Sequence, residues 1–245
     1  MRLFLVQKDV MNIKIGTNNE STRRLWLEQT LQQIPQGARI LDAGAGELQF
    51  KRFCSHLDYV SQDFAQYDGK GDTSGLQMGS WDQSKLDIVC DITAIPEPDG
   101  SFDAIMCIEV FEHLPNPVLA LNEFFRLLRP GGQLILTAPF CSLTHFAPFH
   151  FYSGFNRYFY ETHLPALGLD IVEIQQNGNF FEFLAQEVHR IAFVAKKYAH
   201  TKVSLFEKIF FKIFLLIISK YAKKDTGSAE ILNFGYHVRA VKATI

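Results

Sequence analysis

The first 140 residues alternate between short apolar runs and amphipathic or polar stretches, which is typical of a sheet whose strands are joined by helices and loops. Five segments predict strands: residues 38–41, 58–62, 86–90, 102–108 and 133–138. Residues 19–34 and 117–128 carry apolar side chains on one side and predict helices, the first ended by Pro35 and the second by Arg129-Pro130-Gly131-Gly132. Residues 65–85 are rich in Gly, Asp, Ser and Gln and predict a long loop.

The residues after position 140 change character. Helices are predicted over 154–167, 180–200 and 203–224, and strands over 169–176 and 233–243. The last of these strands alternates apolar and polar residues. The chain therefore predicts an α/β sheet followed by helices that are inserted before a final strand.

Length and composition limit the possible classes of protein. A chain of 245 residues is long enough for one α/β domain with an appendage, and 47% apolar with 20% charged residues excludes wholesale disorder. The net charge of −2 argues against a general nucleic-acid coat, so a nucleic-acid partner is disfavoured. That charge is divided unevenly, with −6 up to residue 140 and +4 beyond it, and 14 of the 23 Phe also lie beyond it.

The ends and the cysteines favour a cytoplasmic protein. The apolar run from Leu3 to Val6 is too short for a secretory signal. Four scattered cysteines without a C-x-x-C pair predict reduced thiols and no zinc site. The longest unbroken apolar run, Ile213 to Ile218, is far shorter than the roughly 20 residues needed to span a bilayer.

A glycine-rich turn follows the first predicted strand, in the sequence ILDAGAGELQF at 40–50. Glycine lets a ligand approach the backbone, and a helix N-terminus after the turn would offer N–H groups to an anion. Gln49 stands where a dinucleotide fingerprint needs its third glycine, so a nicotinamide or flavin dinucleotide site is a poor fit. Taken alone, the turn is equally compatible with an ordinary strand-to-helix connection.

Acidic residues end four of the predicted strands: Asp42, Asp63, Asp91 and Glu109. The carboxyl ends of parallel strands form the edge at which open α/β sheets bind ligands, and a carboxylate there can accept both hydroxyls of a ribose. A single acid at a strand end is more often only solvated. Four at successive strands make the ligand-binding interpretation the stronger one.

Together these motifs resemble the class I S-adenosylmethionine-dependent methyltransferases. The resemblance rests on D-x-G-x-G at 42–46, the acid at 63, D-I-x-x-I-P at 91–96, FDAIMCIEVFEHL at 102–114 and LLRPGGQLILTAP at 127–139. It is strong over residues 38–140 and looser for the last strand. The sequence DAGAGE at 42–47, together with HFYSGFNRYFYETHL at 150–164, is also similar to sequences of methyltransferases of bacterial polysaccharide and glycolipid biosynthesis.

The resemblance implies S-adenosylmethionine as cofactor and assigns residues to it. The methionine end is lined by Asp42, Ala43, Gly44, Ala45 and Gly46, and closed by Glu109; the ribose and adenine are bound by Asp63, Phe64, Asp91 and Ile92. Many relatives have glycine where this chain has Leu48, a departure that bears on cofactor affinity.

The resemblance also implies a Rossmann-like, doubly wound sheet of seven mostly parallel strands with an antiparallel last strand. Within one methyltransferase domain of residues 1–245, we expect a cofactor core at 19–140, an acceptor region at 141–178, a helical insertion at 179–230 and the last strand at 231–245.

Methyl transfer to oxygen, which we expect, needs removal of the acceptor's proton. His113 and His150 are the candidate catalytic residues, because they follow the fourth and fifth strands and imidazole titrates near neutral pH. His113 is also compatible with packing or capping the next turn. His145 and His150 do not predict a metal site, since no carboxylate lies nearby in the sequence.

Two features of the second part bear on the acceptor and on partners. Residues 146–160, FAPFHFYSGFNRYFY, carry eight Phe and Tyr that fit either an apolar or sugar-like acceptor or a packed lid. Residues 190–224 hold nine Lys and Arg and one acid, and the predicted helix at 203–224 leaves only a lysine stripe exposed. Its apolar surface fits intramolecular packing, a homodimer, or the inner face of a membrane.

The function expected from the sequence is therefore methyl transfer to a small-molecule, glycan or lipid-linked acceptor. The alternative is a non-catalytic methyltransferase-like scaffold or membrane-associated subunit. Binding of the cofactor discriminates between them.

Overall fold

The structure, a computed structural model, describes residues 13–244, so the run from Leu3 to Val6 lies outside it. The chain divides into two compact units. We call residues 25–175 with 235–245 the core unit, and the described residues up to 24 with 176–234 the helical unit.

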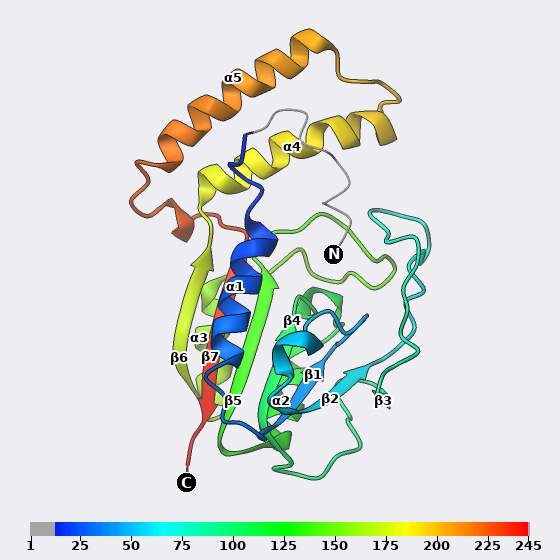
Figure 1. Ribbon diagram of the computed structural model, residues 1–245, viewed down its shortest axis with the longest axis vertical. Helices are drawn as coiled ribbons and strands as arrows, with labels where there is room; N and C mark the ends of the chain where they lie inside the picture. Colours follow the sequence, from blue (N-terminus) through cyan, green and yellow to red (C-terminus); the bar gives the residue numbers. More distant parts are fainter. Residues whose placement is uncertain (1–12, 245) are drawn as a thin grey trace. The chain divides into compact units, whose positions relative to one another are not determined.

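The core unit is built on a seven-stranded sheet in the order β3-β2-β1-β4-β5-β7-β6 (Figure 1). The strands are β1 (Arg39–Ala43), β2 (Asp58–Asp63), β3 (Ile88–Val89), β4 (Phe102–Ile108), β5 (Leu128–Pro139), β6 (Leu169–Asn177) and β7 (Gly235–Lys242). β1 to β5 pair in parallel, and β7 pairs antiparallel with β5. The predicted sheet, with its antiparallel last strand, is confirmed. The carboxyl ends of β1, β2, β3, β4 and β5 therefore share one edge.

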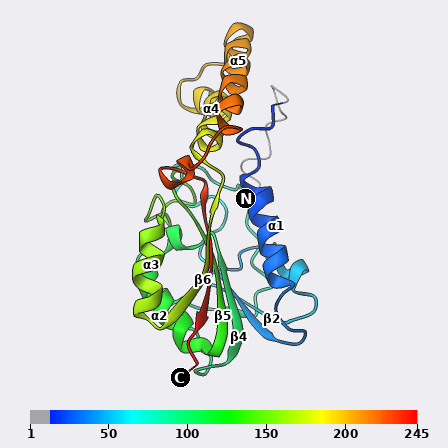
Figure 2. The ribbon, with the colours of Figure 1, turned by 90° about the vertical axis from the view of Figure 1, so that its left-hand side faces the viewer.

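Helices cover both faces of this sheet: α1 (Asn19–Leu31), α2 (Pro117–Leu127) and α3 (Arg157–Ala166). Figure 2 views the sheet nearly edge-on, with α2 and α3 on one side and the core-unit part of α1 on the other. Leu27 packs with Met106 in one buried cluster, and Phe124 packs with Leu164 in the other. Because both faces are covered, the central strands are almost continuously apolar, which is why they were recognisable in the sequence.

Two expected elements differ from the structure. No α-helix follows β1; residues 46–50 form turns and lead to a 3₁₀ helix at Lys51–Cys54. Leu48 lies in the left-handed region (φ 59°), and a left-handed residue cannot continue a right-handed helix. β3 is only two residues long, since the Asp87 carboxylate accepts the Ser61 N–H (2.9 Å) just before β2 pairs with β3.

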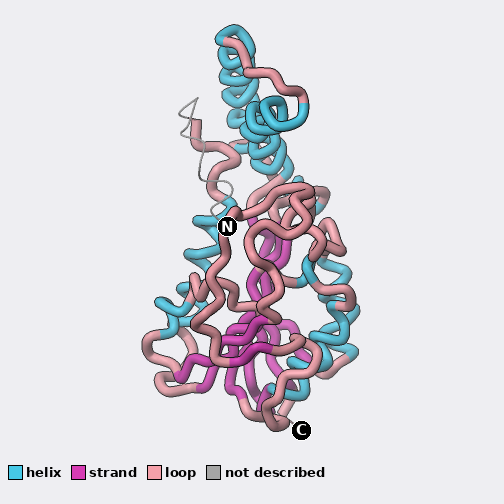
Figure 3. Tube along the Cα trace, turned by 90° about the vertical axis from the view of Figure 1, so that its right-hand side faces the viewer, coloured by secondary structure: helices cyan, strands magenta, loops and turns pink. Residues whose placement is uncertain are grey.

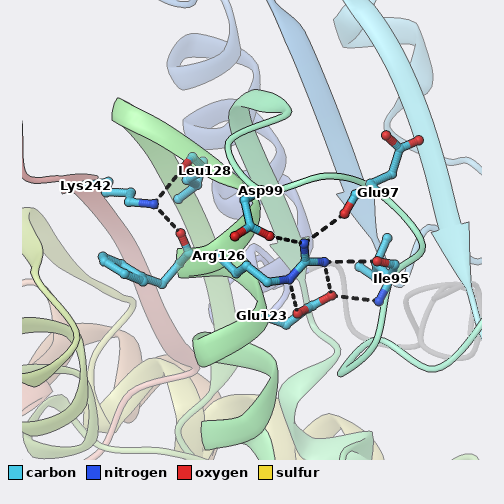
Figure 4. A network of polar contacts seen from close by, with 8 residues as sticks. Ile95, Glu97, Asp99, Glu123, Arg126, Leu128 and Lys242 are labelled. Carbon is cyan, nitrogen blue, oxygen red and sulfur yellow. Dashed lines mark hydrogen bonds and ion pairs between the residues drawn. The ribbon is translucent and has the colours of Figure 1, made fainter.

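A polar network fixes the segment that follows β3 (Figure 4). Arg126, near the end of α2, donates to the carbonyls of Ile95 (3.0 Å) and Glu97 (2.8 Å) and to Asp99 Oδ1 (2.7 Å). Glu123, one turn earlier, accepts from Arg126 and from the Ile95 N–H (2.7 Å). Hydrogen bonds from Arg126 are the main cause that lowers the pKa of the buried Glu123 carboxyl. Secondary structure is absent from this segment, so side chains hold it in place.

The helical unit contains α4 (Phe180–Tyr198) and α5 (Leu205–Ala222). Asn179 caps α4, and Ser204 with Glu207 forms a capping box at the start of α5. Leu215 and Ile218 of α5 pack against Ala185 and Val188 of α4. In the part of the chain that the structure describes, no helix is long and apolar enough to cross a membrane.

The expectation that α5 exposes only a lysine stripe is wrong. Leu215 and Ile218 are its only fully buried residues, and nine of its large apolar side chains are among the exposed ones. Within the helical unit, the buried side of α5 packs in a small cluster with α4, Ile13 and Ile15, and this cluster does not cover an apolar surface that extends around most of α5.

Candidate active site

The turn after β1 is held against β2 by its own backbone. The N–H groups of Gly44 and Ala45 both donate to the Gln62 carbonyl (2.9 Å each), and Gly46 N–H donates to Asp63 Oδ2 (3.0 Å). Gly44 and Gly46 adopt φ of 79° and 53°. A Cβ on Gly44 would lie 2.5 Å from Val110 Cγ2, so glycine is required by both conformation and space.

Asp63 organises the end of β2. Its Oδ1 accepts from the Ala65 N–H (3.1 Å) and from Gln83 Nε2 (2.9 Å), while Oδ2 accepts from Gly46. A carboxylate offers about four lone-pair directions. Three of these directions are used here. Asp63 can therefore accept both hydroxyls of a ribose once the hydrogen bond from the Gln83 amide is broken. Gln62 Oε1 is buried nearby in the chain and accepts no hydrogen bond among the described residues, which leaves an acceptor for a ligand at this edge.

Asp42 is buried at the end of β1, where its Oδ2 accepts a hydrogen bond from the Tyr59 hydroxyl (2.6 Å). Burial raises the pKa of Asp42 to about 7, with the nearby Asp63 adding to the shift and the Tyr59 hydrogen bond opposing it. Ionisation of this buried carboxyl is unfavourable unless a positive charge lies nearby. The position therefore suits the positively charged end of a ligand.

The ends of β3 and β4 complete the edge. Asp91 is exposed, and its Oδ1 accepts from Thr93 N (2.8 Å). Ile92 is buried in the core cluster with Ala43. Glu109 follows β4 in the left-handed region (φ 57°), and its Oε1 accepts from the Thr137 hydroxyl (2.9 Å). The predicted cofactor residues are thus gathered at one edge, although Ile92 packs inward.

The loop at 65–85 contributes to the site in a way that sequence reasoning missed. Trp81 lies against the glycine turn, because a Cβ on Gly46 would be 2.6 Å from Trp81 Cζ2. Trp81 also contacts Tyr67 and Phe146 edge-on, and Tyr67 stacks on Phe146 (centroids 4.5 Å apart). Two aromatic residues in an otherwise Gly- and Asp-rich loop are the signal that could have drawn attention to it.

This loop is joined to the loop after β5 by backbone hydrogen bonds. Leu76 N–H donates to the Thr144 carbonyl, and Phe146 N–H donates to the Leu76 carbonyl (3.0 Å each). Figure 3, in which loops are pink, shows how much of this side of the core unit consists of loop. Two segments about 70 residues apart in sequence therefore form one aromatic wall beside the strand ends.

Three histidines and a glutamate gather on the acceptor side. The rings of His113, His145 and His150 have centroids 4.7 to 5.9 Å apart, and Phe146 stacks on His113 (5.0 Å). Glu112 is buried, with Oε1 3.8 Å from His113 Nε2 and 3.9 Å from His145 Nε2. The reason given from the sequence against a metal site therefore fails, because a carboxylate is close in space.

Hydrogen bonds orient these rings. His113 Nδ1 faces the Phe149 carbonyl (2.5 Å), His145 Nδ1 faces the Leu143 carbonyl (2.8 Å), and His150 Nε2 faces the Ser142 hydroxyl (3.2 Å). Burial lowers the pKa of His113 to about 3, with repulsion from His145 as the second cause, and burial also lowers that of His150. A carbonyl can only accept, so a neutral His113 donates from Nδ1 and keeps its lone pair on Nε2.

The comparisons with known proteins agree with this geometry. Residues 41–136 match the family model described as "Methyltransferase domain". Over 104 residues the chain is 35% identical to the "Ubiquinone biosynthesis O-methyltransferase" of Xanthomonas oryzae pv. oryzae (strain PXO99A), covering 41% of this chain and 43% of that protein. It is 31% identical over 170 residues to the "Demethylmenaquinone methyltransferase" of Beutenbergia cavernae, covering 67% and 65%. The chain thus spans less than half the length of the first of these relatives.

The fold has solved counterparts. A crystal structure of "a SAM dependent methyltransferase from Archaeoglobus fulgidus" superposes with a TM-score of 0.56 at 14% identity, covering 91% of this chain and 94% of that one. At that identity the likeness speaks for the fold alone. The glycine turn and the acidic strand ends lie within or beside the segment that matches the methyltransferase-domain model, residues 41–136, and the fold is the Rossmann-like fold of solved methyltransferases.

Proposed function

We propose that the protein is an S-adenosylmethionine-dependent methyltransferase that acts at oxygen on a small-molecule, glycan or lipid-linked acceptor. The observation that carries this proposal is the edge at which the Gly44-Ala45-Gly46 turn, Asp42 and Asp63 meet inside a segment that matches a methyltransferase domain. The curated relatives of Xanthomonas and Beutenbergia are named for methyl transfer in ubiquinone synthesis and on demethylmenaquinone, which supports a small acceptor.

Different residues of the edge bind different parts of the cofactor. Asp63 binds the ribose hydroxyls, and Phe64 with Asp91 binds the adenine, as the family resemblance implies. The turn from Asp42 to Gly46 lines the methionine end, where the raised pKa of Asp42 makes its ionisation responsive to a bound cation. When bound, S-adenosylmethionine supplies a methyl group on a sulfonium, which is already an activated leaving group.

The chain's main task in such a reaction is to position the acceptor oxygen, because proximity and orientation supply most of the acceleration. We assign His113 and His150, the two candidate catalytic residues, to the acceptor side of the site, where His150 can contact the acceptor hydroxyl and His113 lies beside it. Trp81, Tyr67 and Phe146 provide flat apolar surfaces beside them, which suits an acceptor with a ring, a sugar face or a lipid-linked portion.

Calorimetric titration with S-adenosylmethionine and S-adenosylhomocysteine tests the proposal. We expect saturable binding of both, weakened about tenfold to a hundredfold by Asp63→Ala through lost hydrogen bonds to the ribose. Asp58→Ala is the matched control, because Asp58 is an exposed acid at the opposite end of the same strand. Absence of binding by the wild-type protein at millimolar cofactor would overturn the proposed methyltransferase activity and favour a non-catalytic scaffold.

A further inference from the structure

The cluster on the acceptor side has the composition of a divalent-metal site. Glu112 and His113 lie in the 3₁₀ helix at Phe111–His113 that follows β4, and His145 lies in the loop after β5; the ligating atoms of the three residues lie within 4.8 Å of one another. Two histidines and one glutamate form a donor set that zinc enzymes use for catalytic zinc, where a fourth position stays open. All three residues belong to the core unit.

The orientation of the rings is the second observation. His113 and His145 each direct Nδ1 to a backbone carbonyl, of Phe149 and Leu143 respectively, so each Nε2 faces the carboxylate. Metal-binding histidines have this arrangement almost without exception, since the outer hydrogen bond fixes the tautomer and the ring plane. His113 Nε2 is buried and has no hydrogen-bond partner among the described residues, so its lone pair is available.

The distances are close to those that a metal needs. Ligands about 2.1 Å from a tetrahedral zinc lie roughly 3.4 Å from one another. The observed 3.8 and 3.9 Å from Glu112 Oε1 to the two Nε2 atoms exceed that by about half an ångström, which small side-chain rotations close. Glu112 is further fixed by its carbonyl, which accepts from the N–H groups of Phe151 (2.8 Å) and Tyr152 (3.2 Å).

We propose that Glu112, His113 and His145 bind one divalent transition-metal ion, with Zn²⁺ the best fit, and leave an open position for the acceptor hydroxyl. The role of the ion rests on the proposed methyl transfer, whereas its binding does not. A hydroxyl bound to the metal releases its proton to water more readily, the oxygen then forms its bond to the methyl carbon, and the methyl–sulfur bond breaks with both electrons going to sulfur. The products are the methyl ether, S-adenosylhomocysteine and one proton.

Calorimetric titration of the full, untagged chain with ZnCl₂, without cofactor or acceptor, tests binding directly. We expect one Zn²⁺ per chain, and the visible absorption of tetrahedral Co²⁺ when CoCl₂ replaces it. Glu112→Gln and His145→Gln should each weaken Zn²⁺ binding about tenfold to a hundredfold. His163→Ala, a histidine of α3 outside the cluster, should bind as the wild type does.

The outcomes separate this proposal from the proposed function. Zn²⁺ binding that is absent, or unchanged in both cluster variants, overturns the site whether or not the protein binds S-adenosylmethionine. Zn²⁺ binding without cofactor binding supports the site and overturns the methyltransferase instead. Circular dichroism shows whether each variant is folded, and if Glu112→Gln is not, His145→Gln decides the question.

A separate surface of the helical unit points to a partner of a different kind. Phe206, Ile209, Phe210, Ile213 and Ile217 of α5 are all exposed, and their spacing of three and four residues places them on one side of the helix. Contiguous exposed apolar surface of this extent marks an interaction site in soluble proteins.

Charge identifies the occupant. Residues 190–224 carry nine Lys and Arg and a single acid, Glu207. A surface that is both apolar and basic matches an anionic lipid bilayer, into which apolar side chains insert while nearby Lys and Arg are attracted to the lipid headgroups. A second copy of this chain would bring like charges together. We therefore infer that α5 and the lysines around it bind the surface of an anionic membrane.

Sedimentation of the full chain with vesicles of phosphatidylcholine, with and without phosphatidylglycerol, tests this inference. We expect binding that requires the anionic lipid, falls with added salt, and is lost in the double variant Phe206→Ser/Phe210→Ser. Tyr158→Ser, which changes an exposed aromatic residue of α3, is the control and should bind normally. Absence of binding, unchanged binding by the double variant, or a dimer in ultracentrifugation that this variant abolishes without vesicle binding would overturn it.

Discussion

Phenylalanine has opposite surroundings in the two units of this chain. Phe102, Phe111 and Phe124 of the core unit are fully buried, whereas Phe206 and Phe210 of the helical unit are 79% and 59% exposed. In the core unit, the sheet brings apolar residues from distant positions onto common faces and covers them with helices. In the helical unit, two helices offer each other only a narrow contact, so most of the apolar surface of α5 has no cover within the unit.

Hydrophobicity alone does not assign a residue to the core. Residues 102–108 and 205–218 are both strongly apolar, yet one is the centre of the sheet and the other is largely exposed. What differs is the number of elements that pack around each segment. That difference is measurable as the free energy of unfolding of matched variants in the two units.

The largest contrast is between Phe124→Ala and Phe210→Ala. Phe124 is buried among other core side chains, so its truncation leaves a cavity and should cost about 3–5 kcal/mol in the free energy of unfolding. Phe210 is exposed, and its truncation should change the free energy by less than about 0.5 kcal/mol. Urea unfolding of both variants checks this, and a large cost at Phe210 would mean that α5 is covered in solution.

The next contrast concerns cations. Arg126→Ala removes the donor that joins Glu123 to the segment after β3 and should cost about 2 kcal/mol at pH 7, whereas Lys212→Ala on exposed α5 should cost almost nothing. The pKa of Glu123 is lowered in the folded protein, so its stabilisation is complete above the ordinary value of 4.5 and is lost as the pH falls below it.

Unfolding in urea at pH 7 and pH 4 should therefore show that the deficit of Arg126→Ala shrinks in acid. A deficit of equal size at both pH values would show that the Glu123 carboxylate is not what Arg126 stabilises.

The ionisation of two carboxyl groups should change the free energy of unfolding with opposite signs. Burial raises the pKa of Asp42 from 3.8 to about 7, so the folded state binds the proton more tightly and stability falls as the pH rises toward 7. Between pH 5.5 and 7.5 the loss should be about 2 kcal/mol, and Asp42→Asn should remove it. The pKa of Glu207 is lowered by hydrogen bonds from Ser204, so its ionisation favours the helical unit instead.

Urea unfolding across this pH range measures the slope due to Asp42, and unfolding below the ordinary pKa of 4.5, with Glu207→Gln as the matched variant, measures the slope of opposite sign due to Glu207. A wild-type profile no steeper than that of Asp42→Asn would contradict the raised pKa of Asp42.

The smallest effect is expected where a non-glycine residue is left-handed. Leu48 in the core unit and His200 in the helical unit have φ of 59° and 53°. Glycine removes the steric penalty of that conformation but adds freedom to the unfolded chain, so Leu48→Gly and His200→Gly should each change stability by less than about 1 kcal/mol. Calorimetric titration of Leu48→Gly with S-adenosylmethionine checks that the turn still binds cofactor; clearly weaker binding would give the Leu48 side chain a direct role.

Much of the fold was accessible from the sequence because its signals are local. The apolar runs of the central strands, the turn at Gly44 and Gly46, and the acids at the strand ends lie within a few residues of one another, and the resemblance supplied their order. Boundaries were less accessible. The helix expected after β1 is absent because the backbone of Leu48 is in the left-handed conformation. β3 is short because the Asp87 carboxylate accepts a hydrogen bond from the Ser61 N–H of β2.

The acceptor side could not be assembled in this way. Glu112 and His145 are 33 residues apart, and Trp81 lies in a segment whose composition predicted only a long loop. Their proximity depends on the pairing of the 65–85 loop with the loop after β5, through backbone hydrogen bonds that carry no signature in residue type.

The strands of the sheet, the acids at their ends and the excess of phenylalanine and lysine after residue 140 were readable from the sequence, since each follows from composition or spacing along the chain. Which of those phenylalanines are covered, and which ionisable groups face one another, became visible only in the folded chain. The physical reason is that burial and electrostatic environment depend on neighbours contributed by distant segments, and these neighbours exist only once the chain has folded.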